Sequence, residues 1–210
     1  MPTARKTLSE IVAEARSCER CPLFRNATQT VFGQGPVPAF IMLVGEQPGD
    51  SEDKAGLPFV GPAGRILDSA MLQAGMPRDH VYVTNAVKHF KNVPRGKRRI
   101  HQRPNRYEIE RCRWWLDQEL KLVNPRIVVA MGVTAASALA GRTVAISRER
   151  GRILSFGDHL QGVATIHPSY VLRLRDEARH RAFQGFIADL KRAGELVSDA
   201  VAAPARGTIR

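Results

Sequence analysis

The stretch "AFIMLVGEQPGD" (residues 39–50) sets the architecture that the rest of the chain follows, because an unbroken apolar run stops at polar residues and turn formers. A short apolar run bounded in this way predicts a buried strand. A loop rich in Gly, Pro and Asp continues to Gly61, and "PAGRILDSAMLQAG" (62–75) then predicts a helix with Pro at its start and Gly at its end. A buried strand followed by a helix is the first half of a parallel α/β unit.

The same alternation continues along the chain. Further strands are expected at 80–87, 126–132 and 162–168, and further helices at 8–18, 105–123, 133–141 and 179–197. The basic stretch 88–104 is expected to be a loop of the length that carries function. This order predicts an α/β fold, with a parallel sheet between two layers of helices. We expect one domain over residues 1–197 and a flexible tail at 198–210.

Polar side chains stand where the expected strands end. These strand-end residues are Glu46, Asn85 and His167, with Gly132 at the remaining strand. Parallel sheets bind ligands at the carboxyl ends of their strands, so a carboxylate, an amide and an imidazole are expected to share one crevice. Glu46 is a candidate general base or charge stabiliser, with turn capping as the alternative. Asn85 can read the edge of a nucleobase or fix a turn, and His167 can donate to a carbonyl or cap a helix.

An aromatic ring is held rigidly in "GLPFVGPAG" (56–64), where three glycines and two prolines surround Phe59. A ring presented in this way suits stacking on a flat ligand, whereas anchoring a loop is the commoner role of such a residue. Phe59 is therefore a candidate contact for a planar ligand.

The charge of the chain favours a polyanionic partner. Lys and Arg number 32 against 20 Asp and Glu, a formal net charge of +12, and nucleic acid is the commonest polyanion that such a field attracts. No apolar run is long enough to span a bilayer, and the N-terminus lacks the apolar core of a secretory signal. We expect a cytoplasmic protein with no membrane partner.

Three cysteines are present, Cys18, Cys21 and Cys112, and the first two form a CxxC motif. In a reducing compartment this spacing suggests metal or redox chemistry, although a single CxxC is weakly specific. Cys112 follows the basic stretch and His89 follows the second strand, so both can converge on the pair. Three thiolates and an imidazole suit zinc or an iron–sulfur cluster, and the spacing does not separate them. An ordinary buried thiol at Cys112 is the remaining alternative.

The segment "GKRRIH" (96–101) places Lys97, Arg98 and Arg99 beside His101. A cluster of this kind binds phosphate groups. An imidazole can also act as a nucleophile, so the loop can serve to deliver His101 to a reacting atom. The six residues alone favour the phosphate clamp over the nucleophile.

Four separated motifs, in the same order, resemble the family 4, iron–sulfur type of uracil-DNA glycosylase. They are "GEQPGDSEDKAGLPFVGPAGRIL" (45–67), "VYVTNAVKHF" (81–90), "HPSYVLR" (167–173) and the CxxC, and the resemblance covers most of residues 10–195. It implies a three-layer α/β/α fold around a central four-stranded parallel sheet. It also implies a 4Fe-4S cluster that shapes the fold and the DNA-binding loops and takes no part in the chemistry.

Carried over position by position, the resemblance implies that Phe59 stacks on uracil and that Asn85 reads its Watson–Crick edge. His167 is expected to donate to a uracil carbonyl, and Glu46 matches the acidic residue of the first motif. The cysteines that match cluster ligands are Cys18, Cys21 and Cys112.

The chain departs from the family pattern at three places. The segment "KHFK" (88–91) stands where a Cys is usual, so His89 is expected to be the fourth cluster ligand. Gln47 stands where Ala is usual, among the residues expected to bind uracil. The extra basic loop with "GKRRIH" is typical of the UdgX-type subgroup, whose members resemble glycosylases that bind uracil-containing DNA and do not release it.

This subgroup implies that His101 captures the anomeric carbon of the sugar when the N-glycosidic bond opens. Uracil is then released and the protein is joined to deoxyribose, with Glu46 stabilising the cationic sugar or orienting His101. Residues expected to contact the DNA itself are Lys97, Arg98, Arg99, Ser169 and Arg173. The alternatives are a conventional multiple-turnover uracil-DNA glycosylase and a non-catalytic iron–sulfur protein that binds DNA.

The expected partner is uracil-containing DNA. Single strands should be at least as good as duplexes, because flipping a base out of a duplex costs free energy. The protein is expected to be a monomer in a bacterial cytoplasm, associated with the nucleoid through DNA.

Overall fold

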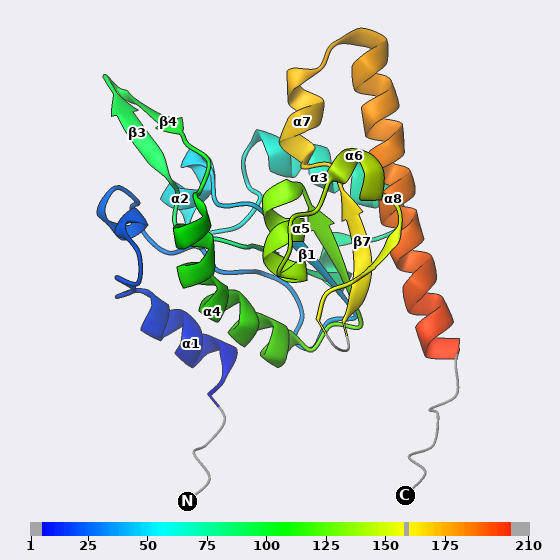
Figure 1. The fold of residues 1–210 in the computed structure, drawn as a ribbon, viewed down its shortest axis with the longest axis horizontal. Helices are drawn as coiled ribbons and strands as arrows, with labels where there is room; N and C mark the ends of the chain where they lie inside the picture. Colours follow the sequence, from blue (N-terminus) through cyan, green and yellow to red (C-terminus); the bar gives the residue numbers. More distant parts are fainter. Residues whose placement is uncertain (1–5, 158–159, 203–210) are drawn as a thin grey trace, which may run out of the picture.

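A central sheet organises the computed structural model, which describes residues 6–157 and 160–202. Within these residues the sheet has five strands in the order β2-β1-β5-β7-β6 (Figure 1). The strands are β1 (Ile41–Gly45), β2 (Val81–Asn85), β5 (Ile127–Met131), β6 (Ile153–Ser155) and β7 (Gln161–Thr165). The expected four-stranded parallel sheet is confirmed by β2, β1, β5 and β7, which all pair in parallel. The antiparallel edge strand β6 was not expected, because it is short and lacks a buried face.

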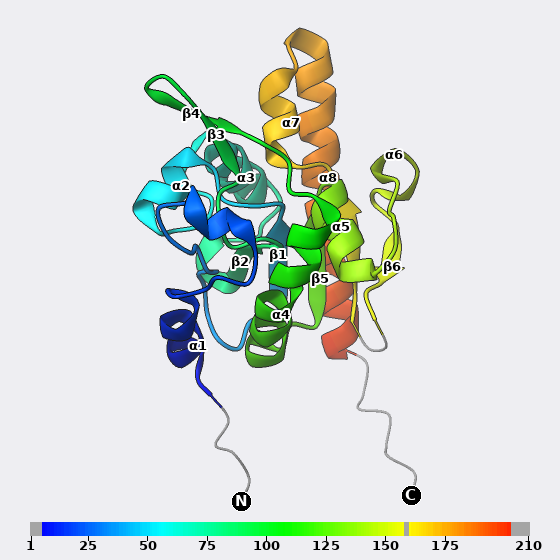
Figure 2. The ribbon, with the colours of Figure 1, turned by 60° about the vertical axis from the view of Figure 1, so that its left-hand side comes forward.

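Helices cover both faces of the sheet, which confirms the three-layer arrangement (Figure 2). On one side lie α3 (Pro62–Gln73), α7 (Pro168–Arg173) and α8 (Asp176–Ala202), and on the other lie α4 (Arg106–Val123) and α5 (Val133–Ala140). Because side chains alternate along a strand, Leu43 of β1 packs in the core on the side of α3, α7 and α8, and Met42 packs in the core on the side of α4 and α5. The remaining helical segments are α1 (Leu8–Ala15), which packs on α4, with η1 (Pro22–Arg25), α2 (Asp50–Ala55), η2 (Arg78–His80) and α6 (Ile146–Glu149).

The basic stretch expected to be a loop instead forms an antiparallel hairpin of β3 (Asn92–Arg95) and β4 (Arg98–His101). Its turn is two residues long, and Gly96 takes φ +58° at the first turn position. A positive φ at this position suits a two-residue hairpin, and glycine adopts it without strain. The hairpin projects from the body (Figure 1). Its exposed strands therefore lack the apolar signal by which buried strands are predicted.

The C-terminal helix is longer than expected. Helix α8 begins at Asp176 and continues to Ala202, into the segment predicted to be a flexible tail, of which residues 203–210 lie outside the described residues. A short helix, α2, also forms inside the expected loop after β1, and its Glu52 side chain binds the loop backbone. None of the described helices is both long and apolar enough to cross a bilayer.

Candidate active site

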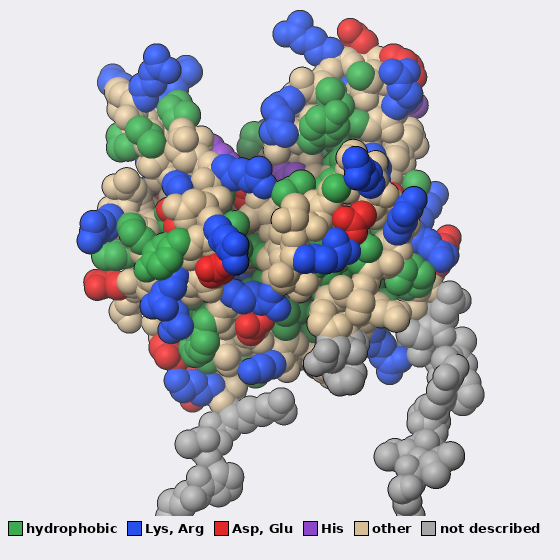
Figure 3. Space-filling view, in the orientation of Figure 1, with side chains coloured by type: hydrophobic (Ala, Val, Ile, Leu, Met, Phe, Trp, Pro, Cys, Tyr) green, Lys and Arg blue, Asp and Glu red, His purple; other side chains and the backbone are tan. Residues whose placement is uncertain are grey.

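A cleft opens at the carboxyl ends of the parallel strands, in the notch between the β3–β4 hairpin and the α7–α8 turn (Figure 3). It contains a cavity of about 540 Å³ lined by Phe59 and Asn85, and a cavity of about 600 Å³ lined by Glu46. Both cavities share the residues Gln47, His101, His167, Ser169 and Arg173. Strand order reverses between β1 and β5, the position at which such sheets bind ligands. The strand-end residues lie along this cleft: Asn85 and His167 line the smaller cavity, and Glu46 and His167 line the larger one.

The Phe59 ring is held in one orientation by the loop around it. Phe59 has φ +56°, a rare value for a residue other than glycine, and is only 6% exposed. A Cβ on Gly64 would lie 1.8 Å from the Phe59 carbonyl oxygen, so this approach requires glycine. Glu52 accepts the N–H groups of Gly49 and Gly61 at 3.1 and 2.7 Å and closes the loop.

Asn85 presents an unpaired amide oxygen beside this ring. It is 1% exposed, and within the described part of the chain its Oδ1 has no hydrogen-bond partner. A buried acceptor without a partner is rare and costs about 1–3 kcal/mol, which is typical of a site that a ligand completes. A Cβ on Gly45 would lie 2.4 Å from Asn85 Oδ1 and 2.5 Å from Phe59 Cζ. Gly45 therefore leaves the space in which the ring and the amide face one ligand.

His167 is a neutral hydrogen-bond donor. The Ser169 N–H donates to its Nδ1 at 3.2 Å. Because a backbone N–H only donates, Nδ1 is an acceptor and the proton of the neutral ring lies on Nε2. Burial, together with the proximity of His101 and Arg173, lowers the pKa of His167 to about 4. The ring centroid lies 6.0 Å from that of Phe59, so the donor and the ring belong to one pocket.

The hairpin carries His101 into the cleft. Its Nε2 lies 2.8 Å from Gln47 Nε2 and 3.6 Å from Glu46 Oε1. Gln47 Oε1 accepts the Lys91 N–H at 3.1 Å, and Gln47 Nε2 donates to the Gln102 carbonyl at 2.9 Å, so the orientation of the amide is determined by its partners. The amide N–H therefore points at His101 Nε2, which accepts it and carries a lone pair.

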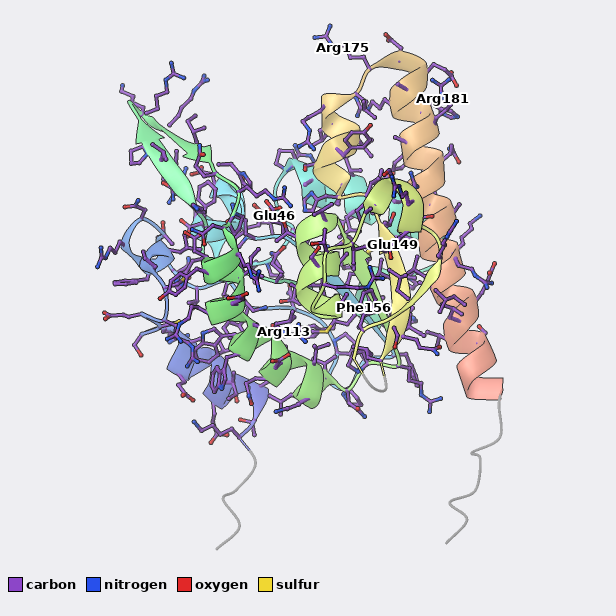
Figure 4. All side chains as sticks on the ribbon, viewed as in Figure 1. Glu46, Arg113, Glu149, Phe156, Arg175 and Arg181 are labelled. Carbon is purple, nitrogen blue, oxygen red and sulfur yellow. The ribbon has the colours of Figure 1, made fainter. Side chains whose placement is uncertain are left out.

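Glu46 lies at the base of the notch (Figure 4). The Thr134 hydroxyl of α5 donates to its Oε2, and Arg103 Nε lies 3.9 Å from the same oxygen. Its other oxygen, Oε1, faces His101. Sequence reasoning missed Thr134 and Arg103, although a hydroxyl two positions after the strand-end Gly132 was a signal that could have been used.

Arg99 is bound inside the protein, unlike its neighbours in the basic segment. Its Nε lies 2.6 Å from Asp50 Oδ1, and its Nη1 lies 2.6 Å from Asp53 Oδ2. Lys97 and Arg98 are exposed at the tip of the hairpin. A phosphate group that contacts Arg99 would therefore have to compete with two ion pairs. Lys97 and Arg98 take part in neither of these two pairs.

The three cysteines lie in one buried cluster with Trp115 of α4. All three are free thiols, at most 9% exposed. The Trp115 Nε1–H donates to Cys18 Sγ at 3.1 Å, and the Lys88 N–H donates to Cys112 Sγ at 3.2 Å. Burial raises the pKa of Cys112 to about 12, so this thiol stays protonated unless a metal binds it. Hydrogen bonds to sulfur are typical of thiolates that bind iron–sulfur clusters.

His89 is also buried, and burial lowers its pKa to about 4, which keeps the ring neutral as a metal ligand must be. In residues 6–157 and 160–202, no group of three or more His, Cys, Asp or Glu side chains is arranged to hold a single metal ion. A tetrahedral zinc site needs its ligands around one point, whereas in a four-iron cluster each cysteine binds an iron of its own. The buried thiols and their N–H donors are the groups of this region that could hold a cofactor.

A buried ion pair connects this region to Asn85. Lys88 and Glu119 have fully buried side chains and form an ion pair, and Lys88 Nζ also donates to the Asn85 carbonyl at 2.6 Å. Tyr82 Oη donates to the same carboxylate at 2.9 Å. Sequence reasoning grouped Lys88 with the exposed basic stretch, and no local signal marked it as buried.

Comparison with known proteins assigns the chain to a family. Residues 32–191 match the uracil DNA glycosylase superfamily. The chain belongs to this superfamily. It is 36% identical over 179 residues to a type-4 uracil-DNA glycosylase of Thermotoga maritima. This alignment covers 84% of this chain and 90% of the relative. It is 32% identical over 201 residues to the type-4 enzyme of Archaeoglobus fulgidus, which covers 91% of this chain and 94% of the relative.

The superfamily match and these type-4 relatives confirm the resemblance to family 4 uracil-DNA glycosylases. The superfamily match contains both cavities of the cleft and leaves out Cys18 and Cys21. The alignment with the Archaeoglobus fulgidus enzyme covers more of this chain than that match. The assignment to the superfamily therefore stands independently of the CxxC.

Proposed function

We propose that this member of the uracil-DNA glycosylase superfamily excises uracil from DNA and is then joined covalently to the deoxyribose C1′ through His101, as in the UdgX-type subgroup. One observation carries the proposal. The Nε2 atom of His101, which holds a lone pair, lies 3.6 Å from the Glu46 carboxylate and lines both cavities of the cleft. A base pocket, a carboxylate and a nucleophile therefore adjoin one another.

The smaller cavity supports recognition of uracil. Phe59 offers a ring for stacking, and the unpaired Oδ1 of Asn85 can accept the N3–H of uracil, a donor that cytosine lacks. The Nε2–H of His167 donates to a uracil carbonyl. These three contacts bind a planar base that has a carbonyl beside an N–H.

Cleavage of the N-glycosidic bond moves its electron pair onto uracil N1 and leaves an oxocarbenium-like sugar. The hydrogen bond from His167 stabilises the uracil anion, whose charge is shared by its carbonyl oxygens. The carboxylate of Glu46, oriented by Thr134, stabilises the cationic sugar. The two charges that form in the transition state thus each face a group of opposite polarity.

Capture of the sugar follows. The hydrogen bond from the Gln47 N–H to His101 Nε2 breaks, and the freed Nε2 lone pair forms a bond to C1′ in the place of water. The imidazole takes the positive charge until its Nδ1 proton passes to solvent. The uracil anion takes up a proton and leaves. Glu46 stabilises the charged imidazole, since its Oε1 is 3.6 Å from Nε2. The abasic sugar stays bound to the protein.

The proposed substrate is uracil-containing DNA, with single strands at least as reactive as duplexes because no base pair has to be opened. The proposed phosphate contacts lie on the two sides of the notch. Lys97 and Arg98 are on the hairpin side, and Arg173 is on the α7 side. The protein is proposed to act as a monomer.

A denaturing gel tests the proposal directly. Wild type and His101→Ser are incubated with a uracil-containing single-stranded oligonucleotide and with a thymine control. A heat-resistant band is expected only with wild type and uracil, while His101→Ser releases uracil with turnover because water reaches the sugar. Alkali-sensitive DNA without the band would instead identify a conventional glycosylase, which the 52% exposure of the His101 side chain favours as the second candidate. Intact DNA would identify a non-catalytic DNA-binding protein.

We also propose that Cys18, Cys21, Cys112 and His89 hold a 4Fe-4S cluster. When bound, the cluster would link η1 to α4 and stabilise the fold beside β2. Analysis of iron and acid-labile sulfide, with the visible absorbance of the purified protein, is the test. Iron and sulfide in equal amounts are expected in wild type and in Tyr107→Ala, an exposed position on α4, and are expected to be lost in Cys112→Ser. Stoichiometric zinc would overturn this assignment.

A further inference from the structure

The larger cavity extends beyond the groups that the proposed reaction uses. Phe59 and Asn85 line only the smaller cavity, Glu46 lines only the larger one, and His101 lines both. The rest of the larger cavity is lined by residues that have no role in uracil recognition or bond cleavage. They include Met131, Val133, Ile146, Ile166 and Tyr170. With a volume of about 600 Å³, it has room for a second base.

The walls of this cavity have the chemistry of a nucleotide subsite. Tyr170 is 42% exposed and Val133 is 37% exposed, so both leave part of their apolar surface uncovered at a concave site. Three arginines, Arg103, Arg150 and Arg173, are also among the lining residues, and the Arg173 guanidinium lies 5.9 Å from the centre of the Tyr170 ring. An exposed aromatic ring beside arginine side chains is the arrangement with which proteins bind single-stranded nucleic acid.

We propose that this cavity binds the base adjacent to uracil in the same strand, stacked on Tyr170. The inference rests on the proposed function and extends it to a second subsite. The two cavities share Gln47, His101 and His167, and the sugar of the target nucleotide has to lie there for His101 to reach C1′. The group that enters the larger cavity is therefore covalently linked to that sugar, and an apolar, aromatic wall selects the neighbouring base over its phosphate.

The subsite favours single strands. In a duplex the neighbouring base is paired and stacked, and moving it into the cavity costs a few kcal/mol in addition to flipping uracil. In a single strand only the stacking is lost, and stacking on Tyr170 replaces it. The contribution of Tyr170 is therefore expected to be larger with single-stranded than with duplex substrate.

The experiment measures single-turnover uracil release and adduct formation on three single-stranded oligonucleotides. One has normal bases around uracil, and the others carry a tetrahydrofuran abasic analogue on the 5′ or the 3′ side. Wild type is expected to be about tenfold slower when the base on one of the two sides is missing. Equal rates on all three would overturn the subsite. No uracil release from any of them would instead refute the proposed function.

Variants assign the effect to the cavity. Tyr170→Ala is expected to be about tenfold slower on the normal oligonucleotide and to lose nothing further with the abasic neighbour, while Tyr170→Phe keeps the wild-type rates. Tyr107→Ala removes a tyrosine that is 55% exposed outside this cavity and is expected to behave as wild type. Val133→Trp fills the cavity from a half-exposed position and should also abolish the preference for an intact neighbour. A Tyr170→Ala variant that still distinguishes the oligonucleotides would contradict the proposal.

Discussion

Arg99 anchors the β3–β4 hairpin, on which His101 lies, to the protein body. Its Nη1 lies 2.6 Å from Oδ2 of Asp53, whose carboxylate is fully buried. Arg99 and His101 are two residues apart on β4, so their side chains leave the same face of the strand. Asp53 is itself held by the Thr28 N–H at 3.0 Å. The ion pair therefore determines which face of the hairpin is turned toward the cleft.

Replacing Arg99 by Leu should affect capture of the sugar more than bond cleavage. The hairpin loses its link to Asp50 and Asp53, and a nucleophile displaced by about 1 Å can lose up to about 100-fold in rate. We expect adduct formation to fall at least tenfold while uracil release changes less, as measured by single-turnover kinetics. Arg98→Leu removes a neighbouring, exposed cation that is a proposed phosphate contact, so it should weaken DNA binding but leave the ratio of capture to release unchanged, and it controls for the lost charge. Equal losses of release and capture in Arg99→Leu would show that the ion pair supports the whole site.

Gln47 is expected to control the protonation site of His101. Gln47→Ala removes the N–H that points at Nε2, and we expect slower adduct formation with retained uracil release. Gln47→Glu cannot donate to Nε2 or to the Gln102 carbonyl, so it favours a proton on Nε2 and should suppress capture more strongly than Gln47→Ala does. The ratio of the capture rate to the release rate in the two variants is the measurement. A higher capture rate in Gln47→Glu would refute the orientation deduced for the amide.

The sheet and its flanking helices could be predicted because buried elements have periodic apolar sequences. The runs at β1, β5 and β7 are apolar enough to identify each strand, and their ends point to Glu46 and His167. The hairpin and α2 could not be predicted in this way. Both are held by polar contacts to distant residues, such as Arg99 with Asp53 and Glu52 with Gly61, which leave no local pattern.

The site shows the same limit. Motif resemblance brought together Phe59, Asn85 and His167 before the structure did, because each lies in a separate, distinctive segment. It did not indicate that Thr134 orients Glu46, or that Lys88 is fully buried against Glu119. These contacts depend on how α4 and α5 pack on the sheet, and the sequence of one segment does not contain that information.

A methyl group on Gly45 should close the uracil pocket. The added Cβ would lie 2.4 Å from Asn85 Oδ1 and 2.5 Å from Phe59 Cζ, so the amide or the ring has to leave its position. We expect Gly45→Ala to lose at least about 100-fold in the rate of uracil release, equivalent to about 2.7 kcal/mol, with the fold retained by circular dichroism. Gly194→Ala, where the new Cβ meets nothing within 4 Å, is the matched control and should keep full activity. Full activity in Gly45→Ala would mean that the pocket forms elsewhere.

The lowered pKa of His167 predicts a pH-dependent stability. Its folded-state pKa of about 4 lies below the ordinary value of 6.5, so the unfolded chain binds the proton first as the pH falls. Stability is therefore complete above about pH 6.5 and decreases toward pH 4. Relative to the non-titrating variant His167→Gln, wild type should lose about 1 kcal/mol between pH 7.5 and 5 in urea denaturation, after allowance for the water-exposed part of the ring. A difference between the two proteins that does not change with pH would indicate an ordinary pKa.

The ion pair of Lys88 and Glu119 predicts a non-additive loss of stability. Lys88→Met leaves a fully buried carboxylate without its cation, and breaking a buried pair from one side costs about 3–5 kcal/mol. In the double variant Lys88→Met/Glu119→Gln the neutral amide can still accept from Tyr82 Oη and the Gly33 N–H, so we expect at least half of that loss to be recovered. Urea denaturation of wild type, the two single variants and the double variant measures the coupling. A double variant that is less stable than Lys88→Met would show that Glu119 acts independently of the lysine.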